Sequence, residues 1–222
     1  MTTSLRAGLS FCTLGGHIVF LDLPADRYFA LSQALEITFK KAVAGISLSE
    51  TERSSLVKAQ LIAPGSAPLS LRPSEAIRPN SSVFEASRPD FHWPDVGSLA
   101  FRIFRARLNL RFKGLPATVA HLMRHKPHSE GNEAQASSSI PGALFQAAAA
   151  QHACARLFGS HDLCLPYAIA VARHLHARGV PADLVIAVGM PPFRAHAWVQ
   201  WRDVLINERL EIAAHYTPIA VL

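Results

Sequence analysis

A cysteine and a histidine in the second half of this 222-residue chain have the types and spacing needed for thiol chemistry. Cys164 stands two residues before Pro166. Proline is tolerated in a helix only in the first turn, so the cysteine is expected where a helix begins. Free backbone N–H groups and the positive end of the helix dipole favour the thiolate there, and the same N–H groups can receive an oxyanion. Ser160 and Asp162 are the candidate N-cap residues.

His196, in the run RAHAWVQW, is the candidate base for this thiol. Alternation puts His196 and Trp198 on one face of a strand and Ala197 on the other. One ring nitrogen of His196 can take the thiol proton while a side chain on the next strand, either Glu208 or Asn207, orients the other nitrogen. A half-buried core histidine is the alternative interpretation of the same pattern.

The elements expected around these residues are three helices and then three strands. Helical periodicity, with glycines at the ends of the second and third segments, predicts helices at 98–112, 141–159 and 164–179, and β-rich runs predict strands at 182–190, 196–201 and 204–207. Helices followed by an antiparallel sheet are typical of an α+β domain.

The first part of the chain predicts a smaller unit. The β-rich runs at 17–23 and 27–32 form a hairpin, and helices follow at 33–45 and from Ser47 to about Leu61. Strands followed by short helices indicate a winged-helix-like domain at 1–75. Six prolines between Pro64 and Pro94 then predict an extended linker at 76–94, and the larger α+β domain occupies 95–222.

Composition excludes several classes of protein. Half of the residues are hydrophobic, but the apolar runs are too short to span a bilayer, and no secretory signal precedes them. The three cysteines form no disulfide framework, which indicates a reducing, cytoplasmic setting. No cysteine–histidine spacing matches a common metal site, and no glycine-rich phosphate loop is present.

The net charge of +6 is scattered except at one place in the chain. Four arginines gather there: Arg102, Arg105, Arg107 and Arg111. We interpret them as the solvated side of a helix rather than a nucleic-acid surface, although attraction of an acidic partner or peptide stays open. The nearly balanced charge of the small domain likewise argues against DNA binding.

Residues 162–201, DLCLPYAIAVARHLHARGVPADLVIAVGMPPFRAHAWVQW, resemble the B protein of lasso-peptide biosynthesis, a transglutaminase-like, papain-like cysteine peptidase. The shared pattern is a Cys that opens a helix and the motif F-x-A-H-A-W-V further on, and the terminal YTPIAVL is similar to the family's closing segment. The resemblance implies that Cys164 is the nucleophile and His196 the proton shuttle. The family usually shows Asn-Asp where this chain has Asn207–Glu208, so position matching assigns the orienting role to Glu208, with Asn207 as the alternative.

The run HIVFLDLPADRYFALS is similar to the strand pair of a leader-recognition element related to the pyrroloquinoline-quinone chaperone. This second resemblance implies that a leader peptide adds to the sheet as an extra strand, near Tyr28, Phe29 and Leu31. In many lasso systems the recognition element and the protease are separate chains, whereas the two resemblances imply that they are fused here.

Together the resemblances imply a cytoplasmic peptidase that binds the leader of a lasso precursor and cuts at the leader–core junction before macrolactam cyclisation. Its implied partners are the precursor and an asparagine-synthetase-like, ATP-dependent cyclase, without nucleic acid or membrane. The chemistry needs no metal or other cofactor, and whether this chain itself depends on ATP stays open. Two alternatives are a non-catalytic leader-binding scaffold and a transglutaminase-like acyl transferase.

Overall fold

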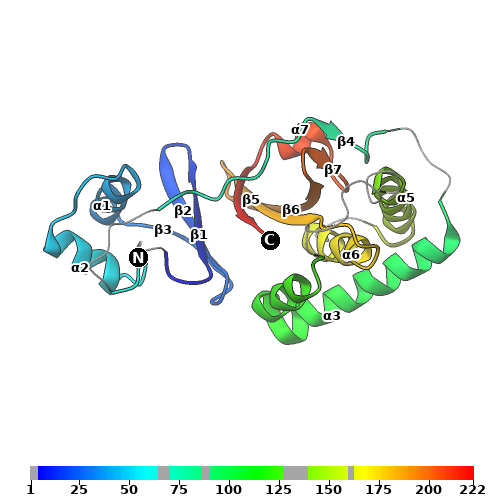
Figure 1. Cartoon of the computed structure of the whole chain (residues 1–222), viewed down its shortest axis with the longest axis horizontal. Helices are drawn as coiled ribbons and strands as arrows, with labels where there is room; N and C mark the ends of the chain where they lie inside the picture. Colours follow the sequence, from blue (N-terminus) through cyan, green and yellow to red (C-terminus); the bar gives the residue numbers. More distant parts are fainter. Residues whose placement is uncertain (1–4, 65–70, 87–90, 128–139, 160–162) are drawn as a thin grey trace. The chain divides into compact units, whose positions relative to one another are not determined.

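The computed structural model describes residues 5–64, 71–86, 91–127, 140–159 and 163–222 (Figure 1). The chain divides into two compact units, Met1–Glu75 and Ala76–Leu222. Both units combine helices with a β-sheet, so the predicted α+β class is confirmed. Among the described residues, none of the helices has the length and apolar character needed to cross a membrane.

The first unit is a three-stranded antiparallel sheet followed by two helices. The elements are β1 (Leu9–Leu14), β2 (His17–Asp22), β3 (Arg27–Ala30), α1 (Gln33–Val43) and α2 (Glu50–Lys58). The predicted hairpin is present as β2 and β3, which pair Phe20 with Phe29. β1 pairs with the other side of β2, so β3 forms an edge of this sheet.

Aromatic packing joins the sheet of the first unit to α1. Phe39 lies edge-on to both Phe11 and Phe20, with ring centroids 5.0 Å apart in each case. All three rings are almost fully buried, and such edge-to-face pairs stabilise a core beyond the area that they bury. At α2, Ser49 and Glu52 form a reciprocal capping box, so the helix begins at Glu50 and not at Ser47 as predicted.

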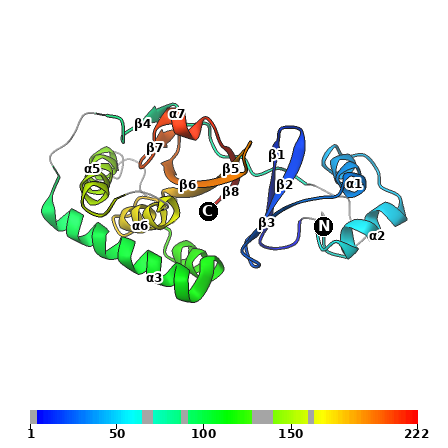
Figure 2. The same cartoon turned by 180° about the vertical axis from the view of Figure 1, so that it is seen from behind.

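The second unit consists of helices packed on a five-stranded sheet. Its helices are α3 (Trp93–Arg124), α5 (Ile140–Phe158), α6 (Cys164–His176) and the short α7 (Leu210–Ala213). The strands, in spatial order, are β4 (Ser81–Ser82), β7 (Val204–Leu205), β6 (Arg194–Trp201), β5 (Asp183–Gly189) and β8 (Thr217–Val221). β4 and β7 are parallel, and the other pairs are antiparallel. Figure 2 shows α6 between this sheet and α3.

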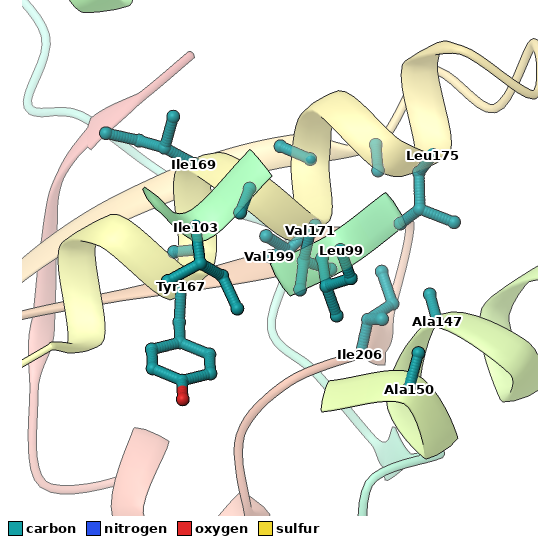
Figure 3. Close-up of a cluster of buried hydrophobic side chains, with 14 of the residues drawn as sticks. Leu99, Ile103, Ala147, Ala150, Tyr167, Ile169, Val171, Leu175, Val199 and Ile206 are labelled. Atoms are coloured by element: carbon teal, nitrogen blue, oxygen red, sulfur yellow. The ribbon is translucent and has the colours of Figure 1, made fainter. Parts of the chain in front are cut away.

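Helix α6 is the buried centre of the second unit. Every residue from Tyr167 to Ala172 is buried. Figure 3 shows Ile169, Val171 and Leu175 of α6 among side chains from the neighbouring elements. Three of the residues in this stretch are alanines, whose small side chains let the surrounding elements approach closely. The packing fixes α6 on most sides and therefore fixes the position of its first residue, Cys164.

Helix α3 extends further than the sequence pattern predicts. The predicted helix ends at residue 112, whereas α3 continues to Arg124 across a break at Gly114, whose φ of 75° and ψ of 173° are non-helical. Pro116 lies in the first turn after the break, where a missing N–H costs little. The Thr118 hydroxyl donates a 2.8 Å hydrogen bond to the Gly114 carbonyl and supports the restart.

Part of the segment predicted as a linker pairs with the second unit. Ser81 and Ser82 form β4 and lie in register with Val204 and Leu205 of β7. Asn80 also donates a 2.6 Å hydrogen bond to Asp203. Two further elements that the sequence pattern did not predict are the short helix α7 and the last strand β8.

Candidate active site

Cys164 is the first residue of α6, as its distance from Pro166 predicts. Leu163 occupies the N-cap position and makes no side-chain capping bond. The two predicted caps, Ser160 and Asp162, lie outside the described residues. Because the backbone N–H groups of the first helical turn have no partner within their own helix, the start of α6 offers donors to a negatively charged sulfur.

The thiol of Cys164 lies beside the imidazole of His196. Burial alone would raise the pKa of Cys164, but a hydrogen bond with His196 and the charge of that ring hold it below the ordinary value of 9.0. The backbone N–H groups of Ala197 and Leu165 also bond to the sulfur and lower its pKa further. These contacts stabilise the thiolate, which is the nucleophilic form of cysteine.

Glu208 contacts the other side of the same imidazole. Its Oε2 lies 2.5 Å from Nε2 of His196, so Nδ1 is the ring nitrogen left for Cys164. Burial alone would lower the pKa of His196, but the hydrogen bonds with Cys164 and Glu208 and their charges raise it to about 9. The site therefore holds the sulfur of Cys164, the imidazole of His196 and the carboxyl group of Glu208 in one hydrogen-bonded line.

Asn207, the alternative orienting residue, contacts a different group. Its Oδ1 accepts a 2.6 Å hydrogen bond from the backbone N–H of Val199, and the backbone carbonyl of Asn207 accepts one of 3.3 Å from Gln151. Asn207 follows β7 by two residues, and its side chain is buried against the backbone of β6. The geometry thus brings Cys164, His196 and Glu208 together, while Asn207 fixes the backbone next to them.

We expect Asn207→Ala to destabilise the protein by about 1–3 kcal/mol, because the buried N–H of Val199 would lose its acceptor. The midpoint of urea unfolding, followed by circular dichroism, measures this change. Glu211→Ala, at an exposed site on α7, is the control and should leave the midpoint unchanged. An Asn207→Ala protein as stable as the wild type would contradict the anchoring role.

Aromatic rings enclose His196 on the face that it shares with Trp198. The ring of Tyr216 lies 5.0 Å from the imidazole centroid and that of Trp198 lies 6.2 Å away. Gly189 makes room for Tyr216, because a Cβ at position 189 would lie 3.1 Å from the carbonyl oxygen of His215 and 3.2 Å from the Tyr216 ring. These rings restrict the imidazole to orientations compatible with its two hydrogen bonds.

Two neighbours of the site, Ser82 and Tyr216, are not among the site residues that the sequence predicts. Ser82 of β4 donates a 2.7 Å hydrogen bond from its hydroxyl to the backbone carbonyl of Glu208. Tyr216 precedes β8 and contacts His196 only through the tertiary fold. Neither belongs to a local pattern around Cys164 or His196, so only the three-dimensional structure reveals them.

The arrangement can perform nucleophilic attack on a carbonyl carbon. The thiolate supplies the nucleophile, the imidazolium supplies a proton to the leaving group, and Glu208 holds the imidazole in place. Within the described part of the chain, no group of three or more His, Cys, Asp and Glu side chains is arranged to hold a metal ion.

Cys164 should be the thiol that reacts selectively with iodoacetamide at pH 7. Burial raises the pKa of both Cys12 and Cys154 to about 11, whereas the pKa of Cys164 is lowered. Peptide mass spectrometry of alkylated protein at a series of pH values measures this, and the Cys164 labelling midpoint should lie below pH 9. In His196→Ala the pH midpoint of Cys164 labelling should rise, because the thiolate loses its contact with the imidazole. Equal labelling of all three cysteines in folded protein would be inconsistent with the geometry.

The three residues predicted to bind a leader lie on or beside β3 in the first unit. Tyr28 and Phe29 belong to β3, and Leu31 lies between β3 and Ser32, the N-cap residue of α1. Phe29 stacks on Phe20 with ring centroids 5.1 Å apart, and the guanidinium of Arg27 lies 5.3 Å from the Phe29 ring. The side chains of Tyr28, Phe29 and Leu31 are half-buried.

Comparison with known proteins assigns the second unit to a family. The family model of the transglutaminase-like superfamily, which includes cysteine peptidases and acyl transferases, matches residues 102–221. No curated protein and no solved structure matches the chain. The matched region contains Cys164, His196 and Glu208 and covers more than half of the 222 residues. The chain therefore belongs to the transglutaminase-like superfamily.

Proposed function

We propose that this protein is a cysteine peptidase that removes the leader from a lasso precursor peptide. The observation that carries the proposal is the hydrogen-bonded line of Cys164, His196 and Glu208 at the start of a buried helix. The resemblance of residues 162–201 to the lasso B proteins supports the choice of substrate, and so does the small unit that precedes the peptidase unit. The enzyme would act in the cytoplasm without a metal.

Cleavage would begin with attack of the Cys164 thiolate on the scissile carbonyl of the leader–core bond. Backbone N–H groups near the start of α6 would stabilise the resulting oxyanion. His196 then gives its proton to the departing amine of the core peptide, which leaves a thioester on Cys164. Water attacks this thioester after losing a proton to His196, and the leader is released as a carboxylate.

The first unit would capture the leader by β-augmentation, in the manner of a winged-helix-like recognition element. β3 is an edge of its sheet, and among the described residues no strand pairs with its outer side. An extended peptide can therefore hydrogen-bond to the β3 backbone while its side chains contact Tyr28, Phe29 and Leu31. The connecting segment tethers the bound leader to the peptidase unit and raises its local concentration there.

We expect the double substitution Tyr28→Ser, Leu31→Ser to weaken leader binding by at least about tenfold, since loss of apolar anchors typically costs more than 1 kcal/mol each. Fluorescence anisotropy with a labelled leader peptide measures the affinity. The value of kcat/KM for the full precursor should fall in parallel, whereas cleavage of a short peptide containing only the junction should not change. Ile46→Ser, at an exposed apolar side chain of the same unit, is the matched control. Unchanged leader affinity would place the recognition surface elsewhere.

Mass spectrometry of the precursor after incubation with the protein distinguishes the proposal from its alternatives. Hydrolysis yields a leader and a core whose masses sum to that of the precursor plus one water. An acyl transferase, a class that the superfamily also includes, would alter the precursor mass without splitting the chain. A leader-binding scaffold would leave the precursor intact, even with an asparagine-synthetase-like cyclase and ATP present.

The proposed reaction also determines what must follow it. Cleavage exposes a new amino group at the start of the core, which is the nucleophile that a macrolactam-forming cyclase needs. We therefore place an ATP-dependent cyclase of the asparagine-synthetase type next in the sequence of reactions. Incubation with and without this cyclase shows whether cleavage depends on its presence.

A further inference from the structure

The outward face of α3 carries a row of exposed apolar side chains that no part of the described second unit covers. Phe101, Phe104, Leu108 and Phe112 are all exposed, Phe112 by 73%. Their spacing of three, four and four residues places them on one face of the helix, over about 16 Å of its length. We call these four residues the α3 ridge. A contiguous exposed apolar row of this kind marks an interaction site more often than isolated surface residues do.

The ridge is separate from the side of α3 that stabilises the fold. Leu99, Ile103 and Ala106 of the same helix are buried and pack in the core around α6. Helix α3 thus presents one apolar side to its own domain and a second apolar side outward. Packing within the described part of the second unit does not use the second apolar side, so its composition requires another explanation.

Uncompensated positive charge borders the ridge. Arg105, Arg107 and Arg111 are exposed on α3, and among the described residues none of them forms an ion pair with a carboxylate. Asp95 is the only acidic residue of the 32-residue helix, and it pairs with Arg178 of the segment after α6. The charge beside the ridge is therefore almost entirely positive.

Two further arginines, which are partly buried, add to the positive charge near the ridge. Burial lowers the pKa of both Arg102 and Arg173. The charges of Arg178 and Arg105 lower the pKa of Arg102 further, and the charges of Arg105 and Arg102 do the same to Arg173. The Nε of Arg102 is buried without a hydrogen-bond partner in the described part of the chain. Keeping several guanidinium groups so close is unfavourable in the isolated protein, and a partner with negative charge would offset that cost.

We infer that the α3 ridge and its bordering arginines are a docking surface for an amphipathic helix of a partner protein, with acidic side chains on both sides of its apolar face. Ridge residues at three- and four-residue spacing match the way in which two helices pack, and arginines beside the row select acidic flanks. A second copy of this chain is a poor occupant, because two ridges would bring their arginines together. The inference does not depend on the proposed peptidase function.

Binding of two synthetic helices to the full-length protein tests this surface. Both helices have three heptads with leucine along the apolar face, and they carry either glutamate or lysine at the flanking positions. Fluorescence anisotropy should show binding of the glutamate helix, weakened by added salt, and no binding of the lysine helix. Phe104→Ser and Arg105→Glu should each weaken the binding by roughly tenfold.

Matched variants on α5 provide the controls. Phe158→Ser and Arg156→Glu change an exposed phenylalanine and an exposed arginine away from the ridge, and they should leave the affinity unchanged. Selective alkylation of Cys164 over the buried Cys12 and Cys154 verifies that every variant is folded. Equal affinity for the two helices, or equal affinity of wild type and ridge variants, would overturn the inference. So would ridge-dependent binding to phosphatidylserine vesicles without binding of the glutamate helix, because the surface would then be one for an anionic membrane.

Discussion

Cys164→Ala is expected to leave the precursor uncut, with a cleavage rate at least roughly 10⁴-fold below that of the wild type, because loss of a catalytic nucleophile costs factors of this size. The Cys164 thiolate is the strongest nucleophile in the line that it forms with His196 and Glu208. Single-turnover cleavage followed by mass spectrometry measures the rate. Leader affinity, measured by anisotropy, should not change, since the predicted recognition residues lie in the other unit.

Cys154→Ala is the matched control for this experiment. Cys154 is a buried core residue whose pKa burial raises to about 11, so it contributes no thiolate at neutral pH. Its alanine variant should cleave at close to the wild-type rate. If Cys164→Ala cleaved as fast as the wild type, Cys164 would not be the nucleophile. If the wild type itself bound the precursor but did not cut it with the cyclase and ATP present, the scaffold function would replace the peptidase.

Glu208→Gln is expected to reduce kcat by roughly 10²–10⁴-fold, by analogy with the loss of the orienting carboxylate from other triads. Glutamine keeps the size of the side chain but removes the charge that stabilises the His196 imidazolium. The pKa of His196 is about 9 with Glu208 in place, so the imidazolium persists up to that pH and is lost above it. Activity that requires the imidazolium should therefore fall on the alkaline side with a midpoint near 9, and in Glu208→Gln this midpoint should move to lower pH.

A pH profile of kcat/KM for wild type and Glu208→Gln measures both effects together. On the acidic side, activity should fall as the Cys164 thiolate takes up a proton, at a pH below the ordinary cysteine value of 9.0. Glu211→Gln, an exposed carboxylate on α7, serves as control and should leave the profile as it is. A Glu208→Gln enzyme with reduced rate but an unmoved alkaline midpoint would indicate that Glu208 acts only through the local fold.

The parts of the site that the sequence predicts are those determined by short stretches of chain. Pro166 restricts where the helix can begin and so places Cys164 in its first turn. Alternation along β6 predicts that Ala197 and Trp198 lie on opposite faces. The structure confirms this, with Ala197 in the core around α6 and Trp198 packed with Val185 of β5. In both cases steric rules that act over a few residues decide the result.

The parts of the site that the sequence does not predict depend on contacts between residues far apart in the chain. Adjacent positions 207 and 208 both carry side chains able to hold an imidazole, and the direction of each depends on its tertiary neighbours. The Asn207 side chain accepts a hydrogen bond from the backbone N–H of Val199 and is therefore not available to His196. Glu208 is the residue that contacts the imidazole. The two-residue strand β4 has no recognisable pattern of its own, because it exists only through its pairing with β7.

The pairing of β4 with β7 has a consequence for the order of events during synthesis of the protein. Ser82 supports the backbone carbonyl of Glu208, which follows it by 126 residues in the chain. A ribosome makes the segment around Ser82 first, and this segment must wait for β7 and Glu208 before it can pair. Contacts over such separations form late in folding because a long loop has to close. An unfinished chain that already carries Cys164 and His196 still lacks Glu208, so a nascent molecule should not cut peptides before its second unit is complete.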